Sequence, residues 1–154
     1  MKKLYMLIGI PGTGKSTWIK NQDWVGDCAI ISSDNHIAAY ADSVGGTYNS
    51  VFDEYYSTAA TKVIEDVKSA IINDKDVIWD QTNISVKSRN KKIALLDDYY
   101  KIAVYFKIPD DDELERRLKS RPGKTISRRL LHQMTSALEP PTIEEGFDEI
   151  WYGG

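Results

Sequence analysis

The sequence predicts an α/β fold in which a parallel sheet of four to five strands lies between two layers of helices. Apolar runs of strand length alternate along the 154 residues with segments of helical period. A glycine-rich loop directly follows the first run, and no repeat, linker or low-complexity stretch divides the chain. Strands that alternate with helices pair in parallel, and right-handed crossovers bring their carboxyl ends to one edge of the sheet, where ligands bind.

Four apolar or β-branched runs are expected to form buried strands, at residues 4–8, 29–32, 76–79 and 102–108. Helical segments are expected at 51–72, 88–97 and 111–120, and a fourth begins at Thr125 or Ser127 and ends before Pro140-Pro141. The clearest helix, 51–72, carries a single apolar stripe that predicts its buried face. The members of this stripe are Phe52, Tyr56, Ala59, Val63, Val67, Ala70 and Ile71.

The remaining apolar positions support two more core-facing helices. These positions are Ile93, Leu95 and Leu96 in the second helix, and Leu130, Leu131, Met134 and Leu138 in the fourth. Residues 42–50 have the composition of a mobile loop. Residues 147–152 form either a last strand or a docked tail, and the sequence leaves both open.

The composition bounds the class of protein. Hydrophobic residues make up 42% of the chain and charged residues 28%, which is ordinary for a globular domain, so one domain is expected over residues 1–154. The apolar runs are too short to cross a membrane, and the run after Met1-Lys2-Lys3 leads straight into the glycine-rich loop, which argues against a signal peptide. The single cysteine, Cys28, forms no internal disulfide and fits a reducing cytoplasm.

The glycine-rich loop carries the strongest signal. Residues 9–16 read Gly9-Ile10-Pro11-Gly12-Thr13-Gly14-Lys15-Ser16 and fit the phosphate-binding pattern G-x-x-x-x-G-K-[ST] between a strand and a helix. In such a loop, backbone N–H groups and the helix dipole bind phosphate oxygens. The lysine reaches the β- and γ-phosphates, and the serine hydroxyl binds Mg²⁺. We therefore expect ATP to be bound by Gly9, Pro11, Gly12, Thr13, Gly14, Lys15, Ser16 and Thr17.

Two carboxylates end strands at the same edge of the sheet. Asp34 follows the second expected strand, and Asp80 follows the third. Phosphoryl transfer uses one carboxylate beside the metal and one that accepts the proton of the attacking hydroxyl. An aspartate directly after an apolar strand suits the metal, so we expect Asp80 and Ser16 to hold Mg²⁺ and Asp34 to act as the base. The alternative for each aspartate is a helix N-cap.

A basic segment is expected to form a lid. Although the net charge of −3 argues against a protein that coats nucleic acid, residues 116–129 carry no acidic residue and seven of the 20 basic ones. Such a segment is usually a solvated helix face, but in phosphoryl transfer a mobile arginine stabilises the developing charge. Arg121 precedes a Pro122-Gly123 break that suits a lid hinge, and Arg117 lies earlier in the same helix. We predict that Arg117 and Arg121 bind the nucleotide and that Arg121 is catalytic with Lys15.

The remaining polar and aromatic residues give weaker signals. His36 and His132 lack metal-ligand spacing and are expected to pack or to face solvent. Tyr56 fits the core stripe, whereas Tyr40 and Tyr48 border the expected loop and either pack or stack on a base.

Together these motifs resemble the kinase domain of the bacteriophage 5′-hydroxyl polynucleotide kinase family. The resemblance spans most of the chain: the strand and loop through Trp18, then Asp34, then Asp80 with Thr82-Asn83 and Arg89, then Arg117-Leu118-Lys119-Ser120-Arg121. It implies a P-loop kinase three-layer sandwich with a helical lid at about 116–129. It also implies ATP and Mg²⁺ as cofactors, Asp34 as general base and Arg121 as the lid arginine. Asp80 would lie beside the acceptor site and the metal.

One departure from the family pattern concerns the acceptor. The family has an arginine shortly after the base that grips the phosphodiester of the acceptor, whereas this chain reads Asp34-Asn35-His36-Ile37. His36, Arg89 or a lid arginine would substitute for it, or the acceptor carries no phosphodiester. Nothing in the chain resembles the phosphatase domain that often accompanies the family.

The leading functional expectation is therefore an ATP-dependent kinase that phosphorylates the 5′-hydroxyl end of DNA or RNA. Asp34, His36, Asp80, Thr82, Asn83 and Arg89 are its expected acceptor-binding residues. The first alternative is a kinase for a nucleoside or sugar, because one scaffold hosts many substrates. The second alternative is a non-catalytic nucleotide-binding switch. A cytoplasmic location is expected, in the host cell if the protein is phage-encoded.

Overall fold

The computed structural model describes residues 1–153, which are built around a five-stranded sheet of order β2-β3-β1-β4-β5. The strands are β1 (Lys3–Ile8), β2 (Cys28–Ile31), β3 (Asp76–Trp79), β4 (Tyr100–Tyr105) and β5 (Glu149–Tyr152). Every neighbouring pair is parallel, which confirms the predicted fold class. The segment at 147–152 that the sequence left open supplies β5, which pairs with β4.

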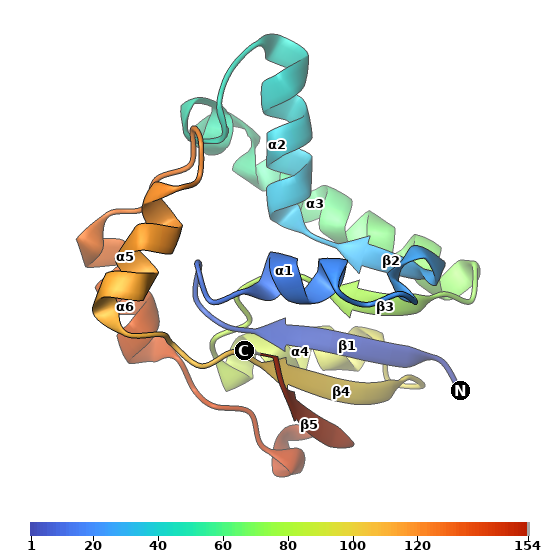
Figure 1. The fold of residues 1–154 in the computed structure, drawn as a ribbon. Helices are drawn as coiled ribbons and strands as arrows, with labels where there is room; N and C mark the ends of the chain where they lie inside the picture. Colours follow the sequence, from blue (N-terminus) through green and yellow to red (C-terminus); the bar gives the residue numbers. More distant parts are fainter. Residues whose placement is uncertain (154) are drawn as a thin grey trace.

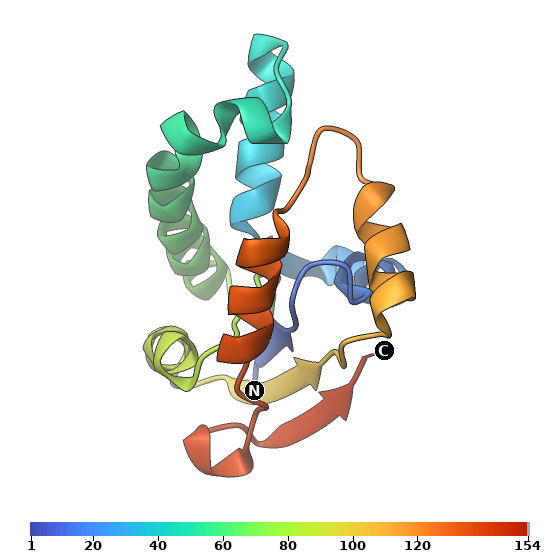
Figure 2. The same cartoon turned by 90° about the vertical axis from the view of Figure 1, so that its left-hand side faces the viewer.

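Helices cover the two faces of the sheet. They are α1 (Lys15–Lys20), α2 (Ser33–Val44), α3 (Tyr48–Ile72), α4 (Val86–Leu95), α5 (Asp111–Lys119) and α6 (Arg128–Ala137). Short 3-10 turns occupy Val25–Asp27 and Ile143–Glu145. Parts of α3 and α4 pack on one face, and α1 packs on the other. Helices α5 and α6 stand opposite α2 and α3 across the carboxyl ends of the strands (Figures 1 and 2). No helix within residues 1–153 is long and apolar enough to cross a membrane.

The apolar stripe predicted along α3 is correct only over its second half. Val63, Val67 and Ala70 are buried against the sheet, but Phe52 and Tyr56 are 37% and 59% exposed. The amino-terminal half of α3 packs instead against α2, which buries Val51 and Ala59. Because α3 meets two different neighbours along its length, its buried face turns and leaves the two aromatic rings outside the core.

Three other apolar expectations were wrong in detail. Leu95, Leu130 and Ile71 are 42%, 44% and 43% exposed. Helix α6 buries none of its residues, and the only buried residue of α4 is Arg89. The sequence predicts a loop at 42–50, but in the structure the loop comprises only residues 45–47. Helix α2 continues to Val44, where Gly45 takes a φ of 72°, and Thr47 caps α3 reciprocally with Ser50.

A buried ion pair ties α4 to the segment before β5. The Arg89 guanidinium, fully buried, donates from Nε to Glu145 Oε1 at 2.6 Å and from Nη2 to Oε2 at 3.1 Å. Glu145→Gln should therefore lower the free energy of unfolding by about 2 kcal/mol, because it leaves a buried guanidinium without its counter-charge. Urea unfolding measures this change. Glu144→Gln removes the same charge from the exposed neighbouring residue, and an equal loss in both variants would contradict the prediction.

Candidate active site

The phosphate loop leads from β1 into α1 and lies beside the ends of β2 and β3. Gly9 is needed at the base of the loop, because an added Cβ would stand 2.7 Å from Thr13 Oγ1 and 3.0 Å from Phe106 Cβ. Gly14 takes a φ of 103°, which turns the chain into α1. The Gly9 N–H donates to Thr82 O at 3.0 Å, so the loop is anchored to the segment that follows β3.

Lys15 folds back over this loop. Its ammonium donates to Gly9 O at 2.6 Å and to Ile10 O at 3.3 Å. Burial lowers its pKa to about 8, although Asp80 and Asp34 nearby favour the charged form. A buried ammonium with only carbonyl partners is ready to bind phosphate oxygens, which would restore its counter-charge.

Asp34, near the start of α2, is held by two partners from elsewhere in the chain. Tyr48 Oη donates to Oδ1 at 2.6 Å, and Lys124 Nζ donates to Oδ2 at 2.8 Å. Burial acts to raise the pKa of Asp34, but the hydrogen bonds from Lys124 and Tyr48 outweigh it and hold that pKa below its usual range. The N-cap alternative does not apply to Asp34, since Ser32 is the cap residue and its hydroxyl accepts from the N–H of Asn35.

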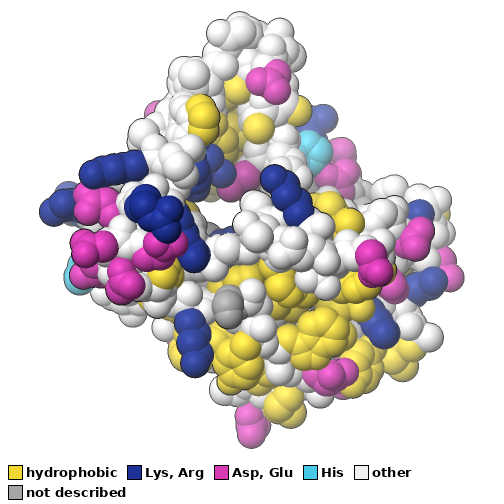
Figure 3. Space-filling view, in the orientation of Figure 1, with side chains coloured by type: hydrophobic (Ala, Val, Ile, Leu, Met, Phe, Trp, Pro, Cys, Tyr) yellow, Lys and Arg dark blue, Asp and Glu magenta, His cyan; other side chains and the backbone are white. Residues whose placement is uncertain are grey.

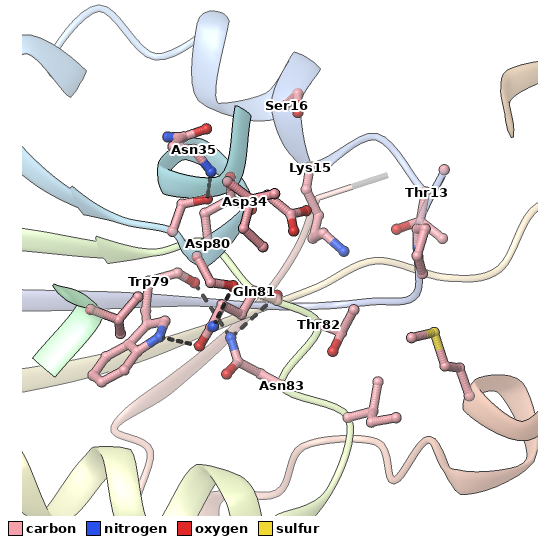
Figure 4. Close-up of a pocket in the computed structure, with 18 of the residues that line it drawn as sticks. Thr13, Lys15, Ser16, Asp34, Asn35, Trp79, Asp80, Gln81, Thr82 and Asn83 are labelled. Atoms are coloured by element: carbon pink, nitrogen blue, oxygen red, sulfur yellow. Dashed lines mark hydrogen bonds between the residues drawn. The ribbon is translucent and has the colours of Figure 1, made fainter. Parts of the chain in front are cut away.

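Asp80, directly after β3, faces the same space from the neighbouring strand (Figure 4). Burial raises the pKa of this carboxyl, with Lys15 opposing the rise and Asp34 adding to it. Within residues 1–153 its carboxylate accepts no hydrogen bond from another residue. Unlike Asp34, which is bound by Lys124, Asp80 therefore has no hydrogen-bonded cation in this part of the chain.

The residues present fit a magnesium ion. Mg²⁺ takes one or two protein oxygens and completes its shell with water and substrate phosphates, so a single carboxylate beside the loop serine is sufficient. Ser16 is exposed in the first turn of α1, and within residues 1–153 the carboxylate of Asp80 forms no ion pair, although the charge of Lys15 acts on it. The part of the chain that the structure describes contains no cluster of three acidic, histidine or cysteine side chains able to hold a metal without such help.

The lid predicted at about 116–129 comprises the end of α5, the following turn and the start of α6. The turn reaches across to the beginning of α3, where the Asn49 N–H donates to Gly123 O at 3.1 Å and Asn49 Nδ2 donates to Thr125 Oγ1 at 2.5 Å. At φ 65°, Gly123 lies so close to Thr47 that an added Cβ would stand 2.9 Å from it. The segment predicted to be a lid therefore contacts the start of α3.

Two lid arginines face the phosphate loop. Arg117 donates from Nε to Glu113 at 2.7 Å and from Nη1 to Gly12 O at 3.3 Å. Arg121 has a buried Nε that finds no hydrogen-bond partner within residues 1–153. Burial lowers its pKa, with Asp34 opposing. A buried guanidinium nitrogen without a hydrogen-bond partner destabilises the fold. An anion bound at Arg121 would supply the missing acceptor.

Most predicted site residues line one cavity of about 1580 Å³. Pro11, Gly12, Thr13, Gly14, Lys15, Ser16, Thr17, Asp34, Asp80, Thr82, Asn83, Arg117 and Arg121 all contribute to its wall. Figure 3 shows the opening under the lid, with Lys and Arg side chains gathered beside it. The cavity continues from the phosphate loop into the space between α3, α4 and α6.

Three predicted acceptor residues have structural partners instead. His36 lies outside the cavity wall, where its Nε2 is 2.6 Å from Asp66 Oδ2 on α3. The Arg89 guanidinium donates hydrogen bonds to Glu145 and to Asn83 O. Its side chain is completely buried, which excludes contact with an acceptor. Asn83 borders the cavity but is only 2% exposed, and its amide donates to Leu7 O at 2.7 Å. We therefore do not retain His36 and Arg89 as substrate-binding residues.

Sequence reasoning missed Lys92, which organises the segment after β3. Its ammonium donates to Gln81 Oε1 at 2.9 Å and to Asn83 Oδ1 at 2.5 Å, and it lies over the ring of Trp79. Burial lowers its pKa to about 8. Lys92 lies three residues after Arg89 on the same helix. Nothing in this sequence pattern distinguishes a buried lysine from one on the surface.

The depressed pKa of Lys92 predicts how stability depends on pH. Between pH 8 and about 10.4 the unfolded chain keeps a proton that folded Lys92 has released, so raising the pH favours the folded state. Relative to Lys92→Met, the wild-type protein should therefore gain about 2 kcal/mol between pH 7.5 and pH 9.5. Urea unfolding at both pH values measures this gain. Lys91→Met should not change the pH slope, and a wild-type slope in Lys92→Met would contradict the prediction.

Comparison with known proteins agrees with this architecture. Residues 4–141 match a family described as AAA domain. A putative kinase from Chloroflexus aurantiacus superposes with a TM-score of 0.72 at 17% identity, over 98% of this chain and 84% of that one. A chain of the Pnkp1/Rnl/Hen1 RNA repair complex gives 0.66 at 23% identity, over 89% of this chain but only 44% of that one. A gluconokinase from Sinorhizobium meliloti gives 0.57 at 14% identity, over 97% and 81%. The fold is that of P-loop kinases.

Proposed function

The chain belongs to the AAA domain family that it matches over residues 4–141, and from this premise we propose that it is an ATP-dependent kinase acting on the 5′-hydroxyl end of a polynucleotide. The observation that carries the proposal is the convergence of Lys15, Asp34, Asp80 and Arg121 on one cavity that extends well beyond the donor site. A cavity of about 1580 Å³ exceeds the ~300–1,000 Å³ of ordinary small-molecule pockets, as expected of a site that holds a nucleotide and a chain end together.

The reaction joins the acceptor oxygen to the γ-phosphorus of ATP and breaks the bond between that phosphorus and the β–γ bridging oxygen, which leaves with ADP. Asp34, ionised at neutral pH because its pKa is depressed, accepts the proton of the attacking hydroxyl. Lys15 and Arg121 stabilise the charge on the transferring and leaving oxygens. Ser16 and Asp80 would hold Mg²⁺, which supplies neutralisation of phosphate charge.

In the closed lid, both oxygens of Asp34 are occupied by Tyr48 and Lys124. An acceptor hydroxyl must displace one of them to reach the carboxylate. Lys124 is the more mobile candidate, because it belongs to the turn of the lid while Tyr48 belongs to the first turn of α3. Acceptor entry is therefore coupled to movement of the lid, and Lys124 places a cation beside the base in a chain that lacks the family's arginine.

A second candidate function is a small-metabolite kinase. The absence of an arginine after Asp34 and the fold likeness to a gluconokinase both favour it. In that case the acceptor would be a compact hydroxyl compound that leaves the far part of the cavity empty.

Label transfer from γ-labelled ATP decides between the two. We expect label on 5′-hydroxyl DNA or RNA oligonucleotides and none on the same oligonucleotides carrying a 5′-phosphate, on nucleosides or on gluconate. Label on a small acceptor with none on any oligonucleotide would replace the proposal by the second candidate. No transfer to any acceptor, with ATP binding intact, would favour a nucleotide-binding switch.

A further inference from the structure

Helix α3 presents an aromatic face to the far part of the cavity. Tyr48, Phe52 and Tyr56 follow at four-residue spacing and all line the cavity wall. Their ring centroids are 5.6 Å and 5.8 Å apart in succession. The series begins at the candidate base, since Tyr48 donates to Asp34, and ends with Tyr56 at 59% exposure. Exposed aromatic rings in such a row mark a binding surface rather than a core.

Helix α4 contributes the cationic wall of the same cavity. Lys87 and Lys91 are exposed, lie one turn apart and line the cavity, and α4 contains no acidic residue. Neither lysine forms an ion pair within residues 1–153, in contrast to Arg116, Arg117 and Lys119 of the lid, which pair with glutamates. Lys92 is not available for a ligand, because its ammonium is bound to Gln81 and Asn83.

The two walls repeat at a common pitch. Along its own helix each series advances by one helical turn, about 6 Å, and both series line the cavity that Asp34 and Asp80 also line. Flat rings offer stacking surfaces to bases of any sequence, and lysines that track the backbone offer charge to its phosphates. A sugar or other compact acceptor would use neither wall.

We propose that this space is a channel for a single-stranded polynucleotide, in which bases stack on Phe52 and Tyr56 while Lys87 and Lys91 contact successive phosphates. The inference rests on the proposed function and deepens it: the 5′-terminal nucleoside lies at Asp34 and Tyr48, and the following nucleotides occupy the channel. Leu130 and Met134 of α6 supply an apolar third wall. The contacts are independent of base sequence, so both DNA and RNA strands fit.

Binding without turnover tests the channel. The probe is a fluorescent 5′-phosphorylated oligonucleotide of about twelve nucleotides, measured by anisotropy without ATP. Phe52→Ala combined with Tyr56→Ala should raise Kd by about tenfold or more. Lys87→Gln combined with Lys91→Gln should raise Kd and reduce the slope of log Kd against log salt by about 1.4, the loss expected for two phosphate contacts to a single strand.

The control is Lys62→Gln combined with Lys68→Gln on α3, away from the cavity wall, which should leave Kd and salt slope unchanged. Unfolding midpoints confirm that each variant is folded. Unchanged Kd and slope in both channel variants, with label transfer by wild-type protein intact, would overturn the channel but not the kinase assignment. Absence of both oligonucleotide binding and label transfer in wild-type protein would overturn both. If the control changed Kd and salt slope as much as Lys87→Gln combined with Lys91→Gln, the effect would come from net charge alone. That result would overturn the proposed phosphate contacts of Lys87 and Lys91.

Discussion

Asp34→Asn is expected to lower phosphoryl transfer by about a hundredfold or more while leaving ATP binding intact. The amide cannot accept the proton of the acceptor hydroxyl, and this is the contribution usual for a positioned base. ATP affinity should persist, because the donor phosphates are bound by the loop and Lys15 on a different strand end. Single-turnover label transfer and equilibrium ATP binding measure the two quantities separately.

The accompanying change in stability should be small. The depressed pKa of Asp34 means that its ionised form favours the folded state above about pH 4 and that this gain is lost as the pH falls. Because the side chain is 51% exposed, the asparagine variant should lose less than about 1 kcal/mol at neutral pH. Asp42→Asn removes the same charge from an exposed site on α2 and should leave transfer unchanged. Full transfer in Asp34→Asn would exclude Asp34 as the base.

The donor half of the site could be predicted from sequence because it is local. The phosphate loop is eight consecutive residues between a strand and a helix, and its pattern implies both backbone shape and chemistry. Asp34 and Asp80 could also be placed together, since parallel strands bring their carboxyl ends to one edge. The structure brings residues 11–16 of the loop, Asp34 and Asp80 to one cavity.

The partners of Asp34 could not be predicted, because they depend on long-range packing. Lys124 is 90 positions away and meets Asp34 only when the lid turn rests on the start of α3. The sequence predicts a loop over 42–50 that includes Tyr48, whereas the Thr47 cap makes Tyr48 the first residue of α3, from which it donates to Asp34. Arg89 shows the opposite error: a family resemblance suggested substrate contact, while the fold buries it against Glu145. In each case the deciding contact joins segments that sequence spacing does not connect.

Arg121→Met is expected to lower turnover by about a thousandfold without lowering the stability of the fold. A lid arginine that meets the transferring phosphoryl group contributes ~10³-fold or more. The stability expectation comes from the buried Nε, which has no hydrogen-bond partner within residues 1–153. An unsatisfied buried polar group costs ~1–3 kcal/mol, so replacing the guanidinium by an apolar chain of similar length should leave the unfolding midpoint unchanged or raise it.

The combination of the two readouts separates function from structure. A structural arginine would lose stability and activity together, whereas a guanidinium kept unpaired for an incoming anion loses activity alone. Arg121→Lys should recover only part of the rate, because an ammonium lacks the planar fork that fits phosphate oxygens. Arg129→Met, on the exposed start of α6, should change neither rate nor midpoint. The Nε of Arg121 has no hydrogen-bond partner within residues 1–153, and a phosphate oxygen would supply one. ATP binding should therefore raise the unfolding midpoint of wild-type protein more than that of Arg121→Met. An equal rise in both proteins would contradict a role for Arg121 at the nucleotide.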